Sequence, residues 1–96
     1  MPFWFYMLKC ADGSYYVGDT DDLERRLAEH HSGALGGYTS TRRPVALAFA
    51  EEFPTRDEAI CRERQVKNWS RAKKEALAAR NWSQLSRLAR GRDLSD

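Results

Sequence analysis

The chain has 96 residues and a mass of 11.1 kDa, which fits one compact domain and excludes two. Hydrophobic residues make up 42% of it and charged residues 31%, so it is not intrinsically disordered. The longest mostly apolar stretches, 3–8 and 45–50, are far shorter than the roughly 20 residues of a membrane-spanning helix. We therefore expect neither membrane insertion nor secretion. Cys10 and Cys61 form no CxxC pair, which favours a reduced, cytoplasmic protein without disulfides or a zinc site.

The net charge of +2 is unevenly distributed along the chain. Residues 1–61 contain six Lys or Arg against ten Asp or Glu, whereas residues 62–96 contain ten against four. Clustered cations of this kind attract a polyphosphate backbone, but they also occur as the solvated face of a helix. The charge pattern alone leaves both explanations open.

Residues 3–18 have the pattern of a β-hairpin, with two β-favouring runs separated by an Asp-Gly turn. A two-residue loop would place Tyr6 and Tyr16 on opposite faces, whereas the three-residue loop 11–13 places them on the same face. We favour the three-residue loop, which pairs Tyr6 with Gly18. Apolar side chains then lie on both faces of the hairpin, so both need covering elements.

A first helix is predicted to begin near Asp21, which accepts hydrogen bonds from the free amides while Glu24 completes a capping box. This helix extends to about His31. The glycine-rich segment 32–43 predicts a loop, and residues 45–49 follow it as a strand.

Three more helices are predicted in the second half of the chain. A capping box at residues 55–58 begins the first, and Ser70 caps a helix that extends to Arg80. Residues 82–90 form a further short helix that Gly91 ends. The predicted order is therefore ββαβαα with an additional C-terminal helix.

Two charged side chains lie on the apolar stripes of the predicted helices, Arg26 on the first and Glu63 on the second. A buried charge is costly unless it is paired or bound to a ligand. Ordinary ion pairs one turn away account for each, with Asp22 for Arg26 and Lys67 for Glu63. His30 lies on the same stripe as Arg26, and a single histidine of this kind is more often structural than catalytic.

The combination of these residue types points to phosphodiester hydrolysis. Glu63 offers oxygens that hold a magnesium ion, and the guanidinium of Arg26 offers forked donors to a phosphate. The phenols of Tyr6 and Tyr16 can take a proton from water if nearby cations lower their pKa. A neutral His30 can receive or relay that proton.

The same residues resemble the GIY-YIG nuclease superfamily, and more narrowly its small bacterial stand-alone members, over residues 3 to about 77. The resemblance rests on Phe5-Tyr6, Tyr16-Val17-Gly18, segment 23–30 and Arg62-Glu63. It implies an α/β (α+β) fold with a three-stranded antiparallel sheet flanked by helices. Residues 1–82 would form the nuclease domain, and residues 83–96 a short helix and tail.

The resemblance also implies a metal-dependent cut that leaves 5′-phosphate and 3′-hydroxyl ends. Tyr6 or Tyr16 would position and deprotonate the attacking water, Arg26 would steady the phosphate, and His30 would assist proton transfer. Glu63 would hold the metal, Mg²⁺ or Mn²⁺.

In the family pattern Gly18 leaves room where the backbone lies close to the site. Asp19 follows it where relatives usually carry an uncharged residue, and its charge either repels phosphate or joins the metal shell. The candidate nucleic-acid-binding residues are Tyr38, Arg42, Arg43, Lys67, Arg71, Lys73 and Lys74. Stacking on Tyr38 would favour single-stranded or branched DNA.

The sequence therefore predicts a metal-dependent DNA endonuclease of repair or processing, monomeric and without a small-molecule cofactor. One alternative is a catalytically weak nucleic-acid-binding accessory protein of the same fold, which the charge of Asp19 favours. A second alternative is a protein-interaction module that uses the basic helices.

Overall fold

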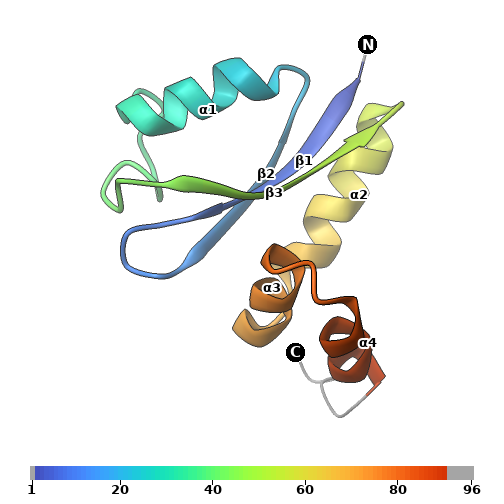
Figure 1. The fold of residues 1–96 in the computed structure, drawn as a ribbon. Helices are drawn as coiled ribbons and strands as arrows, with labels where there is room; N and C mark the ends of the chain where they lie inside the picture. The colour runs from blue at the N-terminus through green and yellow to red at the C-terminus, as the bar shows by residue number, and fades with distance from the viewer. Residues whose placement is uncertain (1, 91–96) are drawn as a thin grey trace.

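The structure, a computed structural model, describes residues 2–90. Its elements in chain order are β1 (Phe3–Lys9), β2 (Tyr15–Thr20), α1 (Leu23–Ser32), β3 (Ala46–Phe53), α2 (Arg56–Lys67), α3 (Arg71–Ala78) and α4 (Trp82–Arg90). The strands form one antiparallel sheet in the order β2-β1-β3. Helix α1 lies on one side of the sheet and α2 and α3 on the other, with α4 beside α3 (Figure 1). The predicted fold class is confirmed, including the additional C-terminal helix.

The register of the hairpin is the one that the three-residue loop requires. Tyr6 lies opposite Gly18 and Leu8 lies opposite Tyr16. Gly13 ends the loop with φ of 86°, a conformation that glycine adopts without strain. Tyr6 and Tyr16 therefore share one face of the sheet, as predicted.

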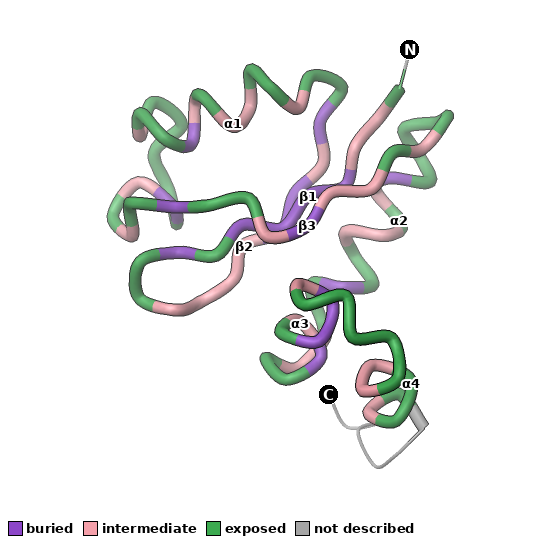
Figure 2. The backbone as a smooth tube through the Cα atoms, in the orientation of Figure 1, coloured by how far each residue is buried: buried purple, intermediate pink, exposed green. Residues whose placement is uncertain are grey.

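Each face of the sheet carries its own apolar core, because successive strand residues point to opposite sides. The core on the α1 side contains Tyr6, Leu8, Cys10 and Val45, with Tyr16, Leu23 and Leu27 packed against it. The core on the α2 side contains Phe5, Met7, Val17, Phe49, Val66 and Leu77. Figure 2 shows that many of the buried residues lie in the middle of the sheet and on α3. Both faces are covered, as the hairpin pattern requires.

Helix α1 begins one residue later than predicted, because Asp22 and not Asp21 is its N-cap. The Asp22 carboxylate accepts a hydrogen bond from the Arg25 amide at 3.1 Å. Thr20 fixes this choice, since its hydroxyl accepts from the Asp22 amide at 3.1 Å. The Asp21 carboxylate instead lies 4.0 Å from the Arg56 guanidinium.

Strand β3 is longer than predicted, because it continues past Phe49 to Phe53 through two glutamates. As an edge strand, β3 can carry charged side chains without burying them. Glu51 pairs with Arg62 of α2 at 3.0 Å, which stabilises this polar end of the strand.

The ends of the later helices agree only in part with the sequence prediction. Thr55 is the N-cap of α2 as predicted: its hydroxyl accepts from the Glu58 amide at 3.3 Å and donates to the Glu58 carboxylate at 2.9 Å. Helix α3 begins after Ser70 as expected but ends at Ala78, because Arg80 adopts a left-handed conformation with φ of 56°. The predicted stop at Gly91 lies outside the described residues. None of the helices within residues 2–90 is long and apolar enough to cross a membrane.

Candidate active site

The candidate site is a cleft of about 260 Å³ that runs along the free edge of β2. It is lined by Tyr15, Tyr16, Val17, Tyr38, Glu63, Lys67 and Lys74. Three consecutive residues of β2 can line one cleft only along the edge of the strand, because their side chains alternate between the two faces of the sheet. The cleft is therefore reached by residues from both sides of the sheet.

The ring of Tyr6 lies across Gly18 on the α1 side. A Cβ atom at position 18 would stand 2.6 Å from the Tyr6 hydroxyl oxygen and 2.7 Å from Cζ, closer than non-bonded atoms approach. The structural role predicted for Gly18 thus has a specific form here. Its missing side chain lets the Tyr6 phenol reach across β2.

The Tyr6 hydroxyl is the centre of a hydrogen-bonded chain. Its oxygen lies 2.9 Å from His30 Nε2, and the Arg26 guanidinium interacts with the same phenol. The other ring nitrogen of His30, Nδ1, lies 2.8 Å from the Thr39 hydroxyl. Tyr6, His30 and Thr39 are all buried, so this chain is shielded from solvent. The tyrosine, the arginine and the histidine that the sequence singled out are in direct contact.

Burial determines the protonation states of the Tyr6 phenol and the His30 imidazole. It raises the pKa of Tyr6 to about 12, although the hydrogen bond from Arg26 works in the opposite direction. Burial, with the nearby charge of Arg26, lowers the pKa of His30 from its ordinary value. Tyr6 is therefore a neutral phenol and His30 a neutral imidazole at pH 7. A neutral imidazole is able to accept a proton.

On the opposite side of the β2 edge, Glu63 of α2 meets Asp19 of β2. Burial, together with a hydrogen bond to Asp19 and the charge of Asp19, raises the pKa of Glu63 to about 7. With a pKa of about 7, the Glu63 carboxyl keeps its proton over part of the neutral range, beside the charge of Asp19. Residues 2–90 contain no group of three or more His, Cys, Asp or Glu that could hold a metal ion, but Glu63 and Asp19 offer carboxyl oxygens of the kind that hard divalent cations bind.

Tyr16 connects the two halves of the site. Its ring centroid lies 5.3 Å from that of His30 and 6.5 Å from that of Tyr6. Burial raises the pKa of Tyr16, and the charge of Glu63 raises it further. The five predicted catalytic side chains are thus linked by contact or by electrostatic interaction.

The ordinary ion pairs considered for the inward charges form differently. Arg26 pairs with Glu29 at 3.2 Å, and Asp22 lies 3.9 Å from Arg25 instead. Because a guanidinium carries five N–H donors, the contacts of Arg26 with Glu29 and Tyr6 leave others for a phosphate.

Aromatic and guanidinium groups are layered at one wall of the cleft. The rings of Tyr16 and Tyr38 are stacked with centroids 6.0 Å apart, and the Arg42 guanidinium lies 3.7 Å from the centroid of Tyr38. Arg42 is held there by Asp12 at 3.1 Å and by the Tyr38 carbonyl at 2.9 Å. Tyr38 is 41% exposed, so this layered group faces solvent.

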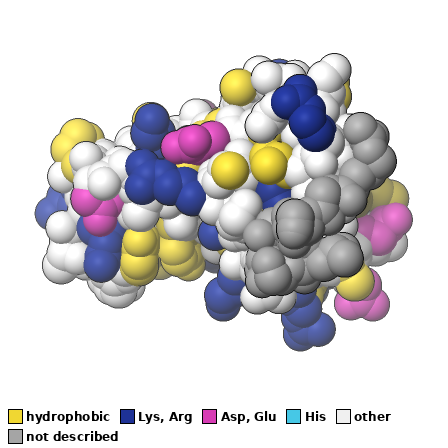
Figure 3. Space-filling view, turned by 90° about the horizontal axis from the view of Figure 1, so that it is seen from below, with side chains coloured by type: hydrophobic (Ala, Val, Ile, Leu, Met, Phe, Trp, Pro, Cys, Tyr) yellow, Lys and Arg dark blue, Asp and Glu magenta, His cyan; other side chains and the backbone are white. Residues whose placement is uncertain are grey.

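The structure separates the predicted nucleic-acid-binding cations into cleft and structural residues. Lys67 and Lys74 line the cleft, and Arg71 is exposed beside α3 with Glu75 at 3.2 Å. Lys73 is only 9% exposed and packs on a tryptophan ring, so it is poorly placed to contact a phosphate. Figure 3 shows Lys and Arg side chains in several groups on the face that includes α3 and α4.

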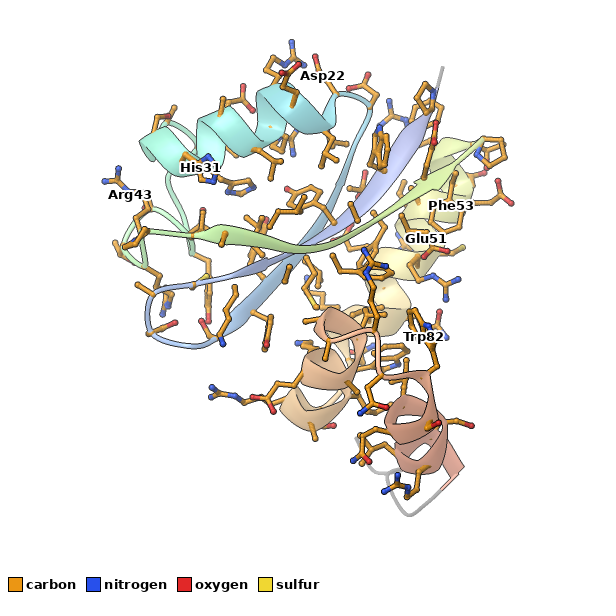
Figure 4. The ribbon with its side chains drawn as sticks, in the orientation of Figure 1. Asp22, His31, Arg43, Glu51, Phe53 and Trp82 are labelled. Carbon is orange, nitrogen blue, oxygen red and sulfur yellow. The ribbon has the colours of Figure 1, made fainter. Side chains whose placement is uncertain are left out.

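Arg43 also has a structural position. Its guanidinium donates to the backbone carbonyls of Ser32 and Ser40, each at 3.1 Å, and lies next to His31 at the end of α1 (Figure 4). A cation at the C-terminus of a helix satisfies carbonyls that have no partner within the helix. Arg43 therefore ties the 33–45 loop to α1.

The sequence assigns no role to Thr39, and it leaves two roles open for Asp19, whose charge either repels phosphate or joins the metal shell. No local pattern shows that α2 brings Glu63 to Asp19, or that the loop returns Thr39 to His30. In the structure, the alternation of side chains along β2 puts Asp19 on the same side of the sheet as Tyr15 and Val17, which is the α2 side.

Comparison with known proteins shows the family of the chain. A family model described as the GIY-YIG catalytic domain matches residues 2–76. The chain belongs to the GIY-YIG family. Among related proteins, a UPF0213 protein of Bacillus pumilus is 51% identical over 72 residues, 75% of this chain and 74% of the relative. A UPF0213 protein of Halobacterium salinarum is 49% identical over 72 residues, covering 94% of that protein.

Solved structures of GIY-YIG relatives have the same fold. The solution NMR structure of a UPF0213 protein from Bacillus halodurans is 43% identical with a TM-score of 0.54, covering 82% of this chain and 84% of that one. A second NMR structure, from E. faecalis, is 42% identical with a TM-score of 0.56, covering 80% and 82%. The GIY-YIG family is a nuclease superfamily, so we interpret the site described above by reference to its catalytic motifs.

Substitution of Gly18 tests the contact between the two strands. We expect Gly18→Ala to lower the free energy of unfolding by about 1–3 kcal/mol, because the added methyl group displaces the Tyr6 ring. Chemical denaturation measures this change. In a Tyr6→Leu background the same substitution is expected to cost less than half as much, whereas equal costs in both backgrounds would contradict the contact.

The lowered pKa of His30 predicts how stability depends on pH. The unfolded chain binds a proton at His30 more readily than the folded chain, so this contribution is present above about pH 6.5 and is lost as the pH falls through the folded-state pKa. The free energy of unfolding of the wild type should fall more steeply between about pH 6.5 and pH 5 than that of His30→Gln. Parallel curves for the two proteins would contradict this assignment.

Proposed function

We propose that this GIY-YIG protein is a metal-dependent endonuclease that hydrolyses DNA phosphodiester bonds in repair or processing. The observation that supports this most is the meeting, at the edge of β2, of a buried Tyr6–His30 pair and a carboxyl pair. The first can carry a proton and the second can hold a divalent cation. Arg26 is the proposed hydrogen-bond donor to the phosphate.

The carboxyl pair suits a divalent metal such as Mg²⁺ or Mn²⁺. Glu63 and Asp19 offer hard oxygen ligands, and the proton of Glu63 is what a cation would replace. When bound, such a cation stabilises the negative charge that develops on the phosphate and its leaving oxygen. Glu63 is the proposed principal ligand, and Asp19 is the proposed second carboxylate.

The proposed proton path begins at Tyr6. A phenol with a pKa of about 12 is not ionised at neutral pH, so Tyr6 removes a proton from water only while it passes its own to His30. His30 is neutral and lies 2.9 Å away, in hydrogen-bonding range. Arg26 donates to the same phenol oxygen and so stabilises the charge that forms on it. Because Tyr16 lines the cleft and Tyr6 is only 1% exposed, we propose that Tyr16 positions the water and that Tyr6 is the base which this single water reaches beside the Tyr16 ring.

The substrate path follows the cations that line the cleft. Lys67 and Lys74 flank Glu63, and the stacked Tyr38 and Arg42 form the opposite wall. Aromatic and guanidinium planes bind unpaired bases by stacking. We propose that single-stranded or branched DNA is preferred, since its bases are free to reach this wall.

Substitution of Glu63 tests the nuclease proposal. We expect Glu63→Gln to lower kcat for Mg²⁺-dependent cleavage of labelled DNA by about 100-fold or more. The thermal midpoint in EDTA should not fall, because the substitution removes a charge next to Asp19. Glu24→Gln, a matched change on the exposed side of α1, should cleave like the wild type. Equal cleavage by Glu63→Gln and the wild type would refute the assignment.

The cleft lysines give a separate prediction about DNA binding. Lys67→Gln together with Lys74→Gln should weaken the affinity for single-stranded DNA about tenfold and lower the slope of log K against log salt by about 1.4, which corresponds to two phosphate contacts. Fluorescence anisotropy over a salt series measures both. Arg56→Gln, which removes a cation at the other end of α2, serves as the control. An unchanged salt slope would argue against this path.

A second candidate is a DNA-binding accessory protein with weak catalysis, because Asp19 adds a negative charge to the cleft. Asp19→Asn separates the two functions. If Asp19 is a metal ligand, the substitution weakens Mn²⁺ binding and slows cleavage. If Asp19 only repels phosphate, the substitution tightens DNA binding while Mn²⁺ affinity stays unchanged.

A further inference from the structure

Thr39 is a buried polar residue in the active-site chain that the proposed reaction does not itself require. It lies in the loop between α1 and β3 and is only 2% exposed. Its hydroxyl is 2.8 Å from Nδ1 of His30. The hydrogen bond therefore joins the loop to the ring nitrogen that faces away from Tyr6.

The partners of Tyr6 determine which nitrogen of His30 carries the hydrogen. A guanidinium donates hydrogen bonds and cannot accept them, so the phenolic proton does not point at Arg26. Tyr6 is only 1% exposed, and among the described residues the group placed to accept that proton is His30, whose Nε2 lies 2.9 Å from the hydroxyl oxygen. A neutral imidazole has one N–H, which is then at Nδ1. This N–H donates to the Thr39 hydroxyl.

The loop holds the Thr39 hydroxyl in a fixed place. The Arg42 amide donates to the Thr39 carbonyl at 3.0 Å, and the Arg43 guanidinium bonds both the neighbouring Ser40 carbonyl and the end of α1. The same helix carries His30. Arg43 therefore ties the loop next to Thr39 to the end of the helix two residues after His30.

We propose that Thr39 is a positioning residue that keeps His30 in its Nδ1–H tautomer, with Nε2 free to accept the proton of Tyr6. Without the hydroxyl, Nδ1–H becomes a buried donor with no acceptor, which disfavours this tautomer. The hydrogen then moves to Nε2, which can no longer accept the proton of Tyr6. The catalytic meaning of this inference rests on the proposed nuclease function, but the tautomer is a property of the folded chain alone.

Nitrogen-15 NMR of the histidine side chain tests the proposal without an activity assay. His30 and His31 are the two histidines of the chain, so a His31→Gln background leaves His30 as the single signal. The intact Thr39 protein should show Nδ1 protonated and Nε2 unprotonated. Thr39→Val, which keeps the shape and loses the hydroxyl, should shift the equilibrium towards Nε2–H, and Thr39→Ser should keep the Nδ1–H tautomer.

Two NMR results would overturn the proposal. One is an Nε2–H tautomer in the protein with Thr39 intact, a result that stands even if Thr39→Val fails to fold. The other is an unchanged tautomer in folded Thr39→Val.

Cleavage kinetics then test the catalytic consequence. We expect Thr39→Val to lower kcat for DNA cleavage about tenfold with KM unchanged, and Thr39→Ser to recover most of it. A tautomer shift without any loss of kcat would overturn the positioning role. If the wild type cleaves no DNA, the nuclease proposal fails, while the NMR result still decides whether Thr39 fixes the tautomer.

Discussion

The close approach of the Tyr6 ring to Gly18 is the contact on which the active site depends. Because position 18 has no side chain, the phenol crosses β2 and brings its hydroxyl to His30 and Arg26 on α1. The approach also depends on the hairpin register, since a slip of one residue would place Tyr6 against a side chain. A short turn between two strands therefore determines where the proton chemistry can occur.

The site combines two environments on opposite sides of one sheet. On the α1 side, the Tyr6–His30–Thr39 chain is buried and neutral, which suits proton transfer between weak acids and bases. On the α2 side, Glu63 and Asp19 bring two carboxyl groups together, which suits a cation. Keeping the groups apart prevents the carboxylates from raising the pKa of His30 and protonating it in advance.

Local sequence signals predicted the elements well, because capping boxes, a turn glycine and alternating apolar residues act over a few residues. The register of Tyr6 and Gly18 followed from loop length alone. What the sequence could not provide depends on distant packing: the meeting of Asp19 with Glu63 is decided by the path of α2. The sequence also could not show that Lys73 is buried, because the long aliphatic part of a lysine side chain packs equally well on a surface or against a core.

The position of β2 at the border of the sheet restricts how this molecule can associate with others. The two outer strands, β2 and β3, have unpaired backbone groups that can add a strand from another chain. Addition at β2 would fill the cleft, whereas addition at β3 leaves it open. A self-assembly that continues the sheet is therefore compatible with an accessible cleft only through β3.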